Sequence, residues 1–350
     1  MSTYTNKRCN YKAIYNFGDA ISDTGNLIRE VHSLASYRFA HFPYGQTINE
    51  ATGRSSDGLL MIDYLTNKVG LGMLEPYLDK SASFKDGVNF AVAGATALAN
   101  ERLMEKGISS PVTSTNNSLT VQLDWFKDYL GNTCSNGLDC LNKLKNSIFM
   151  VGEIGGNDIN YAILQGKTIP EVQSLVHDIV DNIVKVTQTL INLGATQLVV
   201  PGNFPIGCFP IHLTAFEDVP SMSYDKNLCI KEVNELAMYQ NQYLQRALKQ
   251  LRKDNPDVVI LYADYYKAFQ HLLDSASEYG FDEAAKFDAC CGTGGDYNFD
   301  SYRRCGNDRV PVCSNPGQYI SWDGVHPTQM AYQVMAGWLI ENLSFFRCIN

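Results

Sequence analysis

Near the N-terminus, a short β-prone run at residues 13–17 leads into a Gly-Asp turn and then into the expected start of a helix. Ser22 is expected to cap that helix and Asp23 to lie in its first turn. In parallel α/β proteins a strand-to-helix turn of this kind lies at the carboxyl ends of the strands, where ligands bind. The apex of the turn, where a nucleophile would be expected, is occupied by Ala20.

The same alternation continues along the chain. The helix with the clearest signals begins with a capping box of Thr168 and Glu171 and is expected to end at Gly194. Alternating strands and helices predict an α/β fold with a central parallel sheet covered on both faces. No repeat or linker is visible, so we expect a single domain over residues 1–350, with one irregular segment near 288–318. The sequence predicts further strands at 84–93, 146–152, 196–200 and 258–263, and further helices at 59–69, 119–130, 226–252, 265–275 and 328–342.

The charge balance narrows the classes of partner. The chain has 28 Lys and Arg against 37 Asp and Glu, a formal net charge of −9. Such an excess of negative charge disfavours nucleic acid and anionic membrane as partners. No apolar run approaches the roughly 18 residues that a membrane-spanning helix needs, so no stable membrane insertion is expected. A cationic substrate is compatible with this charge, although the charge sum says little about a pocket.

Ten cysteines indicate an oxidising compartment. None forms a CxxC pair, and the spacing of Cys291, Cys305 and Cys313 does not match a common zinc site. Cys134 and Cys140 bracket a short loop and are expected to form a local disulfide, and disulfides are also expected to hold the segment 288–318. The other cysteines are Cys9, Cys208, Cys229, Cys290 and Cys348.

Two glycosylation sequons, at Asn116 and Asn342, point in the same direction. We therefore expect a protein of the secretory pathway, extracellular or vacuolar, whose signal peptide is missing from this chain. The alternative is a cytosolic protein with ten free thiols.

The pair Asp323 and His326 is the second candidate for chemistry. A carboxylate three residues before a histidine can reach its Nδ1 when the backbone turns, which fixes the tautomer and leaves Nε2 free to act as a base. The alternative is a loop histidine that caps the helix expected from residue 328. The sequence around these two residues, taken alone, does not decide between the two interpretations.

Two glycine-containing turns supply candidate hydrogen-bond donors. The run from Gly152 to Asp158 lacks the lysine and the spacing of a phosphate-binding loop, but its Asn157 amide is suited to an oxyanion donor. Gly94, after another expected strand, can offer its backbone N–H to the same oxygen. Taken singly, either feature indicates only a turn. The glycines at 292–295 lie among cysteines and are interpreted as structural.

Four blocks, in order, resemble those of the GDSL esterase/lipase family, also called SGNH hydrolases. They are FGDAISDTGN at 17–26, NFAVAGAT at 89–96, GGND at 155–158 and DGVHP at 323–327. Segments at 42–45, 53–54 and 290–299 resemble the plant branch, which includes sinapine and acetylajmalan esterases. The resemblance implies a flavodoxin-like three-layer α/β/α fold, a secretory signal peptide, and no cofactor or metal.

The resemblance also implies roles for five positions. A serine is expected at position 20 as the nucleophile, where this chain has Ala20. His326 would take its proton and pass it to the leaving alcohol, and Asp323 would orient His326. The backbone N–H of residue 20, the N–H of Gly94 and the side chain of Asn157 would stabilise the oxyanion.

The expected function is hydrolysis of a small-molecule ester of plant specialised metabolism, such as an acetylated alkaloid or a choline or phenolic ester. We expect a monomer that binds this ester and that, with Ala20, does not cleave it. Because the other catalytic positions are intact, a deliberate serine-to-alanine replacement is the interpretation we favour over natural loss. The alternatives are an acyltransferase that uses an alcohol acceptor and a natural non-catalytic binding homologue.

Overall fold

A five-stranded parallel sheet forms the centre of the computed structural model, which describes residues 10–30, 38–109, 115–134 and 137–347. The strand order is β2-β1-β3-β4-β5, the order of flavodoxin-like folds. All five predicted strands are present, although β2 is shorter than expected. The strands are β1 (Ala13–Phe17), β2 (Gly87–Asn89), β3 (Ser147–Val151), β4 (Gln197–Pro201) and β5 (Val259–Ala263).

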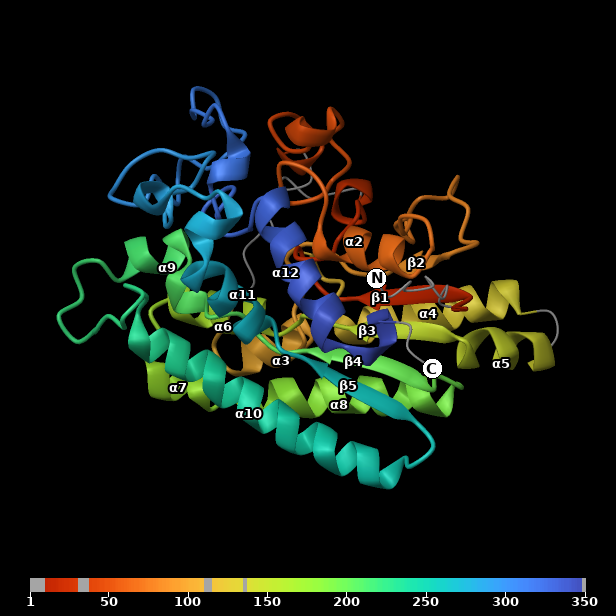
Figure 1. Cartoon of the computed structure of the whole chain (residues 1–350). Coiled ribbons are helices and arrows are strands. Elements are labelled where there is room, and N and C mark those ends of the chain that lie inside the picture. The colour runs from red at the N-terminus through yellow and green to blue at the C-terminus, as the bar shows by residue number, and fades with distance from the viewer. Residues whose placement is uncertain (1–9, 31–37, 110–114, 135–136, 348–350) are drawn as a thin grey trace, which may run out of the picture.

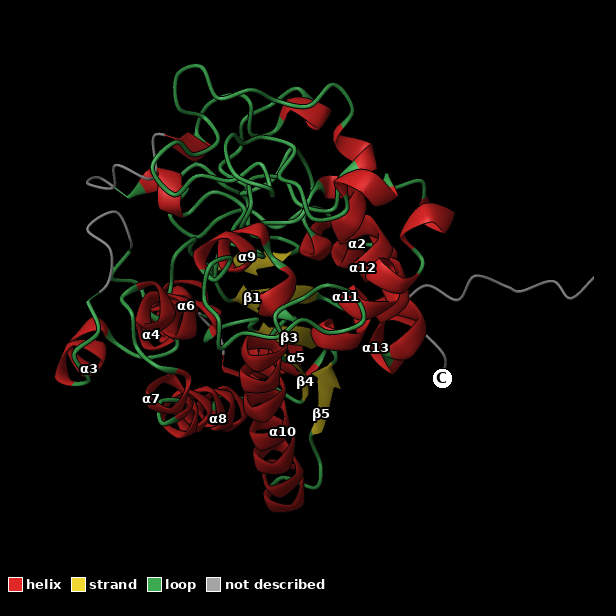
Figure 2. Cartoon of the chain, turned by 90° about the vertical axis from the view of Figure 1, so that its left-hand side faces the viewer, coloured by secondary structure: helices red, strands yellow, loops and turns green. Residues whose placement is uncertain are grey.

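Helices cover both faces of the sheet, as Figures 1 and 2 show. One layer contains α4 (Leu119–Thr133), α8 (Val176–Asn192) and α10 (Lys231–Asp254). The other contains α2 (Met61–Lys68), α11 (Tyr265–Asp274) and α12 (Gln329–Asn342). Because helices lie on both sides, every residue of β1 and β3 is buried. The three-layer α/β/α fold expected from the sequence is confirmed.

The strand order reverses between β1 and β3, because β1 pairs with β2 on one side and with β3 on the other. In open α/β sheets the crevice beyond the carboxyl ends of the strands at such a reversal is where ligands bind. The segments that follow β1, β2 and β3 carry Ala20, Gly94 and Asn157, so the topology directs all three toward the same end of the sheet.

The prediction of a helix that begins at Ser22 is wrong. Residues 18–26 form a series of turns, and the next helical residues are the short 3₁₀ turn η1 (Leu27–Arg29). The carboxylate of Asp23 accepts hydrogen bonds from the backbone N–H groups of Gly25, Asn26 and Leu27 at 2.6–3.1 Å. An aspartate that bonds nearby N–H groups offers the backbone an alternative to a helix.

The long helix predicted for residues 168–194 is divided into α7 (Ile169–Gln173) and α8. The capping box is present, because the backbone N–H and the hydroxyl of Thr168 both donate to Glu171 Oε2 at 2.8 and 2.7 Å. The Ser174 hydroxyl donates to Glu171 O, which ends the first segment.

Helix α10 begins at Lys231, five residues later than expected, because residues 225–230 form a turn. The turn is held by the Asp225 carboxylate, which accepts the N–H groups of Asn227 and Cys229.

Several short elements were not predicted. The most important is α6 (Gly156–Leu164), which carries Asn157 in its first turn. The other helices are α3 (Asn100–Glu105), α5 (Gly137–Lys145), α9 (Pro210–Ala215) and α13 (Ser344–Arg347). The 3₁₀ turns besides η1 are η2 (Gln46–Ile48), η3 (Ile206–Cys208), η4 (Ala276–Tyr279), η5 (Glu283–Ala285) and η6 (Pro316–Gln318).

The eight cysteines of the described segments form four disulfides, including the expected local pair Cys134–Cys140. The others are Cys208–Cys229, Cys290–Cys313 and Cys291–Cys305. The last two close loops in the irregular segment 288–318. Cys9 and Cys348 lie outside the described residues. Four disulfides fit a protein of an oxidising compartment. Among the described residues, none of the helices has the length and hydrophobicity needed to cross a membrane.

Candidate active site

The five residues singled out in the sequence line one cavity of about 430 Å³ at the carboxyl end of the sheet. Ala20, Gly94 and Asn157 come from the segments after β1, β2 and β3, and Asp323 and His326 from the loop that precedes α12. Apolar side chains complete much of the wall: Leu27, Phe39, Leu164, Ile211 and Val325. A mostly apolar cavity with a few convergent polar groups is typical of small-molecule sites.

The carboxylate of Asp323 holds the His326 ring in place. Asp323 Oδ2 lies 2.8 Å from His326 Nδ1, while Oδ1 accepts the backbone N–H groups of Val325 and His326 at 3.0 and 2.8 Å. Tyr44 donates its hydroxyl to Oδ2 at 2.8 Å. All these groups are buried or nearly so, and the carboxylate has at least one partner on each oxygen.

The charge state of Asp323 fixes the tautomer of His326. Burial would raise the pKa of the Asp323 carboxyl, but the charge of His326 and the hydrogen bonds from His326 and Tyr44 outweigh it and lower the pKa to about 2. An ionised carboxylate only accepts hydrogen bonds, so Nδ1 of His326 carries the proton. Nε2 is then the basic nitrogen of the neutral ring.

Ala20 lies at the tip of the turn after β1 and its side chain lines the cavity. No other described residue accepts a hydrogen bond from its backbone N–H. The N–H of Gly94 is likewise without an acceptor within the described segments. Gly94 has φ = 82°, a left-handed conformation that a residue with a side chain rarely adopts. Two unused N–H groups at a cavity wall are suitable donors for an oxyanion.

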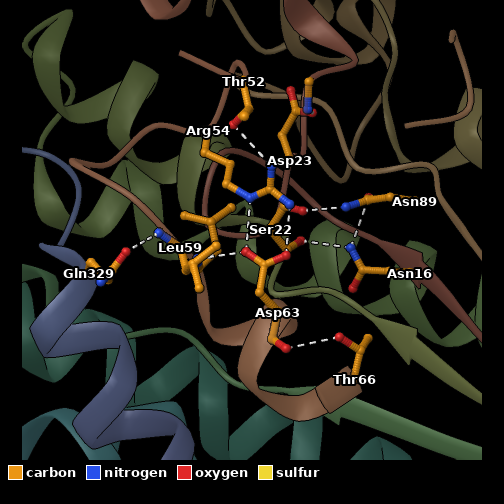
Figure 3. A network of polar contacts seen from close by, with 12 residues as sticks. Asn16, Ser22, Asp23, Thr52, Arg54, Leu59, Asp63, Thr66, Asn89 and Gln329 are labelled. Atoms are coloured by element: carbon orange, nitrogen blue, oxygen red, sulfur yellow. Dashed lines mark hydrogen bonds and ion pairs between the residues drawn. The ribbon is translucent and has the colours of Figure 1, made fainter. Parts of the chain in front are cut away.

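Ser22 is directed away from the cavity, into the polar network of Figure 3. Its hydroxyl accepts a hydrogen bond from Asn16 Nδ2 at 3.0 Å, and its carbonyl accepts one from Asn89 Nδ2 at 2.6 Å. Next to these residues Arg54 and Asp63 form a buried ion pair at 2.7 Å. The network connects the turn to β1, β2 and the start of α2, so Ser22 serves the structure of the turn.

Asn157 is already bonded within the protein. Its Nδ2 donates to Asp19 Oδ2 at 3.0 Å and to the carbonyl of Ala95 at 2.9 Å, which uses both amide hydrogens. A ligand oxygen would have to share or replace one of these bonds. Burial raises the pKa of Asp19 to about 7, which makes the Asp19 contact sensitive to protonation near neutral pH.

Four functional candidates were missed in the sequence. Tyr44 was noted only as part of a turn signal, yet it donates to Asp323. Arg38, Arg304 and Tyr161 also line the cavity, and the Tyr161 hydroxyl donates to Gly94 O at 2.9 Å. Tyr44 and Arg304 lie in irregular segments, Arg38 is helical and Tyr161 lies on α6, and no periodic pattern in the sequence indicated any of them.

The remaining predicted sites lie elsewhere. Asn116 and Asn342 are both exposed, as glycan acceptors need to be, and their glycosylation stays a prediction. In the part of the chain that the structure describes, no group of three or more His, Cys, Asp or Glu side chains is arranged to hold a metal ion.

Comparison with known proteins connects this geometry to a family. Residues 14–339 match the model of the GDSL-like lipase/acylhydrolase family. The chain belongs to this family. An acetylajmalan esterase of Rauvolfia serpentina is 44% identical over 336 residues, which are 96% of this chain and 86% of that protein. Two GDSL esterase/lipases of Arabidopsis thaliana are each 42% identical to this chain. One match covers 95% of this chain and 82% of the relative, and the other covers 99% of this chain and 93% of the relative. The family and the carboxylic ester hydrolase class expected from the sequence are confirmed.

Proposed function

We propose that this cavity binds a small-molecule carboxylic ester and that the same scaffold hydrolyses such esters when serine occupies position 20. The observation that carries the proposal is that the buried pair of Asp323 and His326 lines one cavity with Ala20 and Gly94, whose backbone N–H groups have no acceptor in the described part of the chain. A base and two oxyanion donors around one reacting carbon are the requirements of acyl transfer.

In the serine form the hydroxyl at position 20 attacks the ester carbonyl, and Nε2 of His326 accepts its proton. The negative charge that develops on the carbonyl oxygen is stabilised by the N–H groups of residue 20 and Gly94 and by Asn157. When the intermediate collapses, His326 gives the proton to the leaving alcohol. Water then attacks the acyl-enzyme, with His326 again as the base, and releases the acid.

With Ala20 the attacking oxygen is absent, while the donors and the base remain. Ser22 does not replace it, because its hydroxyl is bonded to Asn16 outside the cavity. The present chain therefore holds an ester without cleaving it. We attribute Ala20 to a replaced serine rather than to gradual loss of the site, because Asp323 still has all its hydrogen-bond partners.

The names of the relatives suggest the substrate class. Acetylajmalan esterases occur among them, so an acetylated alkaloid is one candidate, and choline and phenolic esters of plant specialised metabolism are others. The protein is proposed to act as a monomer in the secretory pathway, extracellular or vacuolar, in agreement with its disulfides.

The Ala20→Ser variant tests the proposal, with the Ala20→Ser, His326→Ala double variant as its matched control. We expect hydrolysis of 4-nitrophenyl acetate by the single variant, with kcat/KM at least about 10³-fold above the Ala20 chain and the double variant. Equal rates for all three proteins would overturn the proposed roles of position 20 and His326. Adding an alcohol acceptor and analysing the products distinguishes hydrolysis from acyl transfer.

A further inference from the structure

Two arginines lie in the wall of the cavity that holds Asp323 and His326. Arg38 and Arg304 line it together with the proposed reaction centre. Both are partly buried, and Arg304 directly precedes Cys305, which is fixed by its disulfide to Cys291. The mechanism described above uses neither of them.

Among the described residues, neither guanidinium group has a carboxylate at ion-pair distance. Ion pairs to Arg38 or Arg304 are absent among the described residues, and the residues outside the description contain no Asp or Glu. Among the described residues that line the cavity, Asp323 is the only acidic one, and its oxygens already accept bonds from His326, Val325 and Tyr44. Of the Arg304 donors, Nε bonds the carbonyl of Ser301 at 3.0 Å.

The two positive charges act on each other. Burial lowers the pKa of Arg304 and the charge of Arg38 lowers it further, although the charge of Asp323 acts in the opposite direction. The two guanidinium groups are therefore close enough to repel each other. Two like charges that are partly removed from water gain from an anion placed between them. Guanidinium groups bind carboxylates through paired, charge-assisted hydrogen bonds.

We propose that Arg38 and Arg304 form a carboxylate subsite of the substrate cavity, so that the preferred ester carries a negatively charged group instead of a positive one. The inference rests on the proposed function and narrows it. It disfavours the cationic candidates, alkaloid acetates and choline esters, and favours an acidic ester such as the acetate of a hydroxylated aromatic acid. The cavity of about 430 Å³ has room for such a molecule.

Three aryl acetates that differ in charge test the subsite: 3-acetoxybenzoate, its methyl ester, and 3-acetoxy-N,N,N-trimethylanilinium. Because the Ala20 chain is expected not to cleave them, their dissociation constants are measured directly by calorimetry. We expect 3-acetoxybenzoate to bind about tenfold or more tightly than the methyl ester, and the cation to bind most weakly, because hydrogen bonds between two charged groups are stronger than those to a neutral ester.

The variant Arg304→Gln should remove most of this preference and leave methyl ester binding within about twofold, whereas Arg304→Lys should retain part of it. Arg303→Gln is the matched control, because it removes the same charge from the neighbouring exposed position outside the cavity wall and should change nothing. Equal binding of the three esters, tighter binding of the cation, or equal effects of Arg304→Gln and Arg303→Gln would overturn the subsite.

The subsite and the proposed function can fail separately. Suppose that the Ala20→Ser variant releases acetate from the methyl ester but shows no preference for 3-acetoxybenzoate after correction for intrinsic reactivity. The function then stands and the subsite is wrong. If it hydrolyses none of the esters while the Ala20 chain still binds 3-acetoxybenzoate through Arg304, the subsite stands and the catalytic assignment is wrong. Absence of charge-dependent binding contradicts the subsite in either case.

Discussion

The two sides of the cavity differ in how complete they are. On the acid–base side, Asp323 accepts hydrogen bonds from His326, Val325 and Tyr44, and its pKa of about 2 keeps it ionised over the whole physiological range. On the oxyanion side, Asn157 is occupied by Asp19 and Ala95, while two backbone N–H groups have no acceptor in the described part of the chain.

The difference reflects what each side has to do. A base must have a fixed tautomer before substrate arrives, so its supporting bonds are made within the protein. An oxyanion donor must remain available for a charge that exists only during the reaction. Asp19, whose pKa burial raises to about 7, adds a group on the oxyanion side whose protonation changes near neutral pH.

The largest effect is expected on the acid–base side. In the Ala20→Ser background, Asp323→Asn should lower kcat by about 10⁴, because an amide no longer fixes the His326 tautomer. Steady-state hydrolysis of 4-nitrophenyl acetate checks this. A loss of less than tenfold would show that the hydrogen bond of 2.8 Å does not control the base.

Removing the Asn157 amide should have a smaller effect. In the same background, Asn157→Ala should lower kcat by about 10²–10³ with little change in KM, if Asn157 leaves Asp19 to bond the oxyanion in the transition state. Steady-state rates of the Ala20→Ser protein with and without Asn157→Ala decide this. A kcat near that of the parent would mean that Asn157 remains bonded to Asp19 and Ala95, and that the two N–H groups act alone.

Tyr44 supports the acid–base side through its hydrogen bond to Asp323. Tyr44→Phe in the serine background removes one of the bonds to Asp323 Oδ2 and should lower kcat by about tenfold. Because the Tyr44 hydrogen bond favours the charged Asp323 carboxylate, its loss should also shift the acid limb of the pH–rate profile to higher pH. An unchanged profile together with an unchanged kcat would assign Tyr44 to packing alone.

The last effect is on stability instead of rate, and it concerns the helix that carries Asn157. Buried His212 contacts Asn160 of α6 through Nε2 at 2.9 Å, and burial lowers its pKa from 6.5 to about 4. Between these values the unfolded chain binds a proton that the folded protein does not, so the free energy of unfolding falls as the pH falls, by up to about 3 kcal/mol. Urea unfolding at pH 7 and pH 4.5 should show a smaller drop for His212→Gln. An equal drop in both proteins would contradict this assignment.

The sequence predicted the sheet well because most of its strands are short apolar runs that are almost fully buried. Short apolar runs of this kind form parallel strands when helices cover both faces of the sheet. The strands predicted at 13–17, 196–200 and 258–263 agree with the observed ones to within one residue at each end. The shared edge of the parallel strands then required that Ala20, Gly94 and Asn157 come together. The spacing of Asp323 and His326 was informative because a carboxylate three residues away reaches Nδ1 within a single turn.

Features that depend on tertiary contacts were not predictable. The helix expected at Ser22 is absent because Asp23 bonds the following N–H groups and also the N–H of Ala93, which lies in another loop. Tyr44 and Arg304 reach the cavity from segments without periodicity, so only the fold places them there.

Covalent labelling tests the central claim, that position 20 is the nucleophile position, most directly. A fluorophosphonate reacts with an activated serine hydroxyl, forming an oxygen–phosphorus bond and releasing fluoride, and intact mass with peptide mapping locates the adduct. The Ala20→Ser chain should gain one adduct, at position 20, and the Ala20 chain should gain none. An adduct at Ser22, or equal labelling of both chains, would contradict the account.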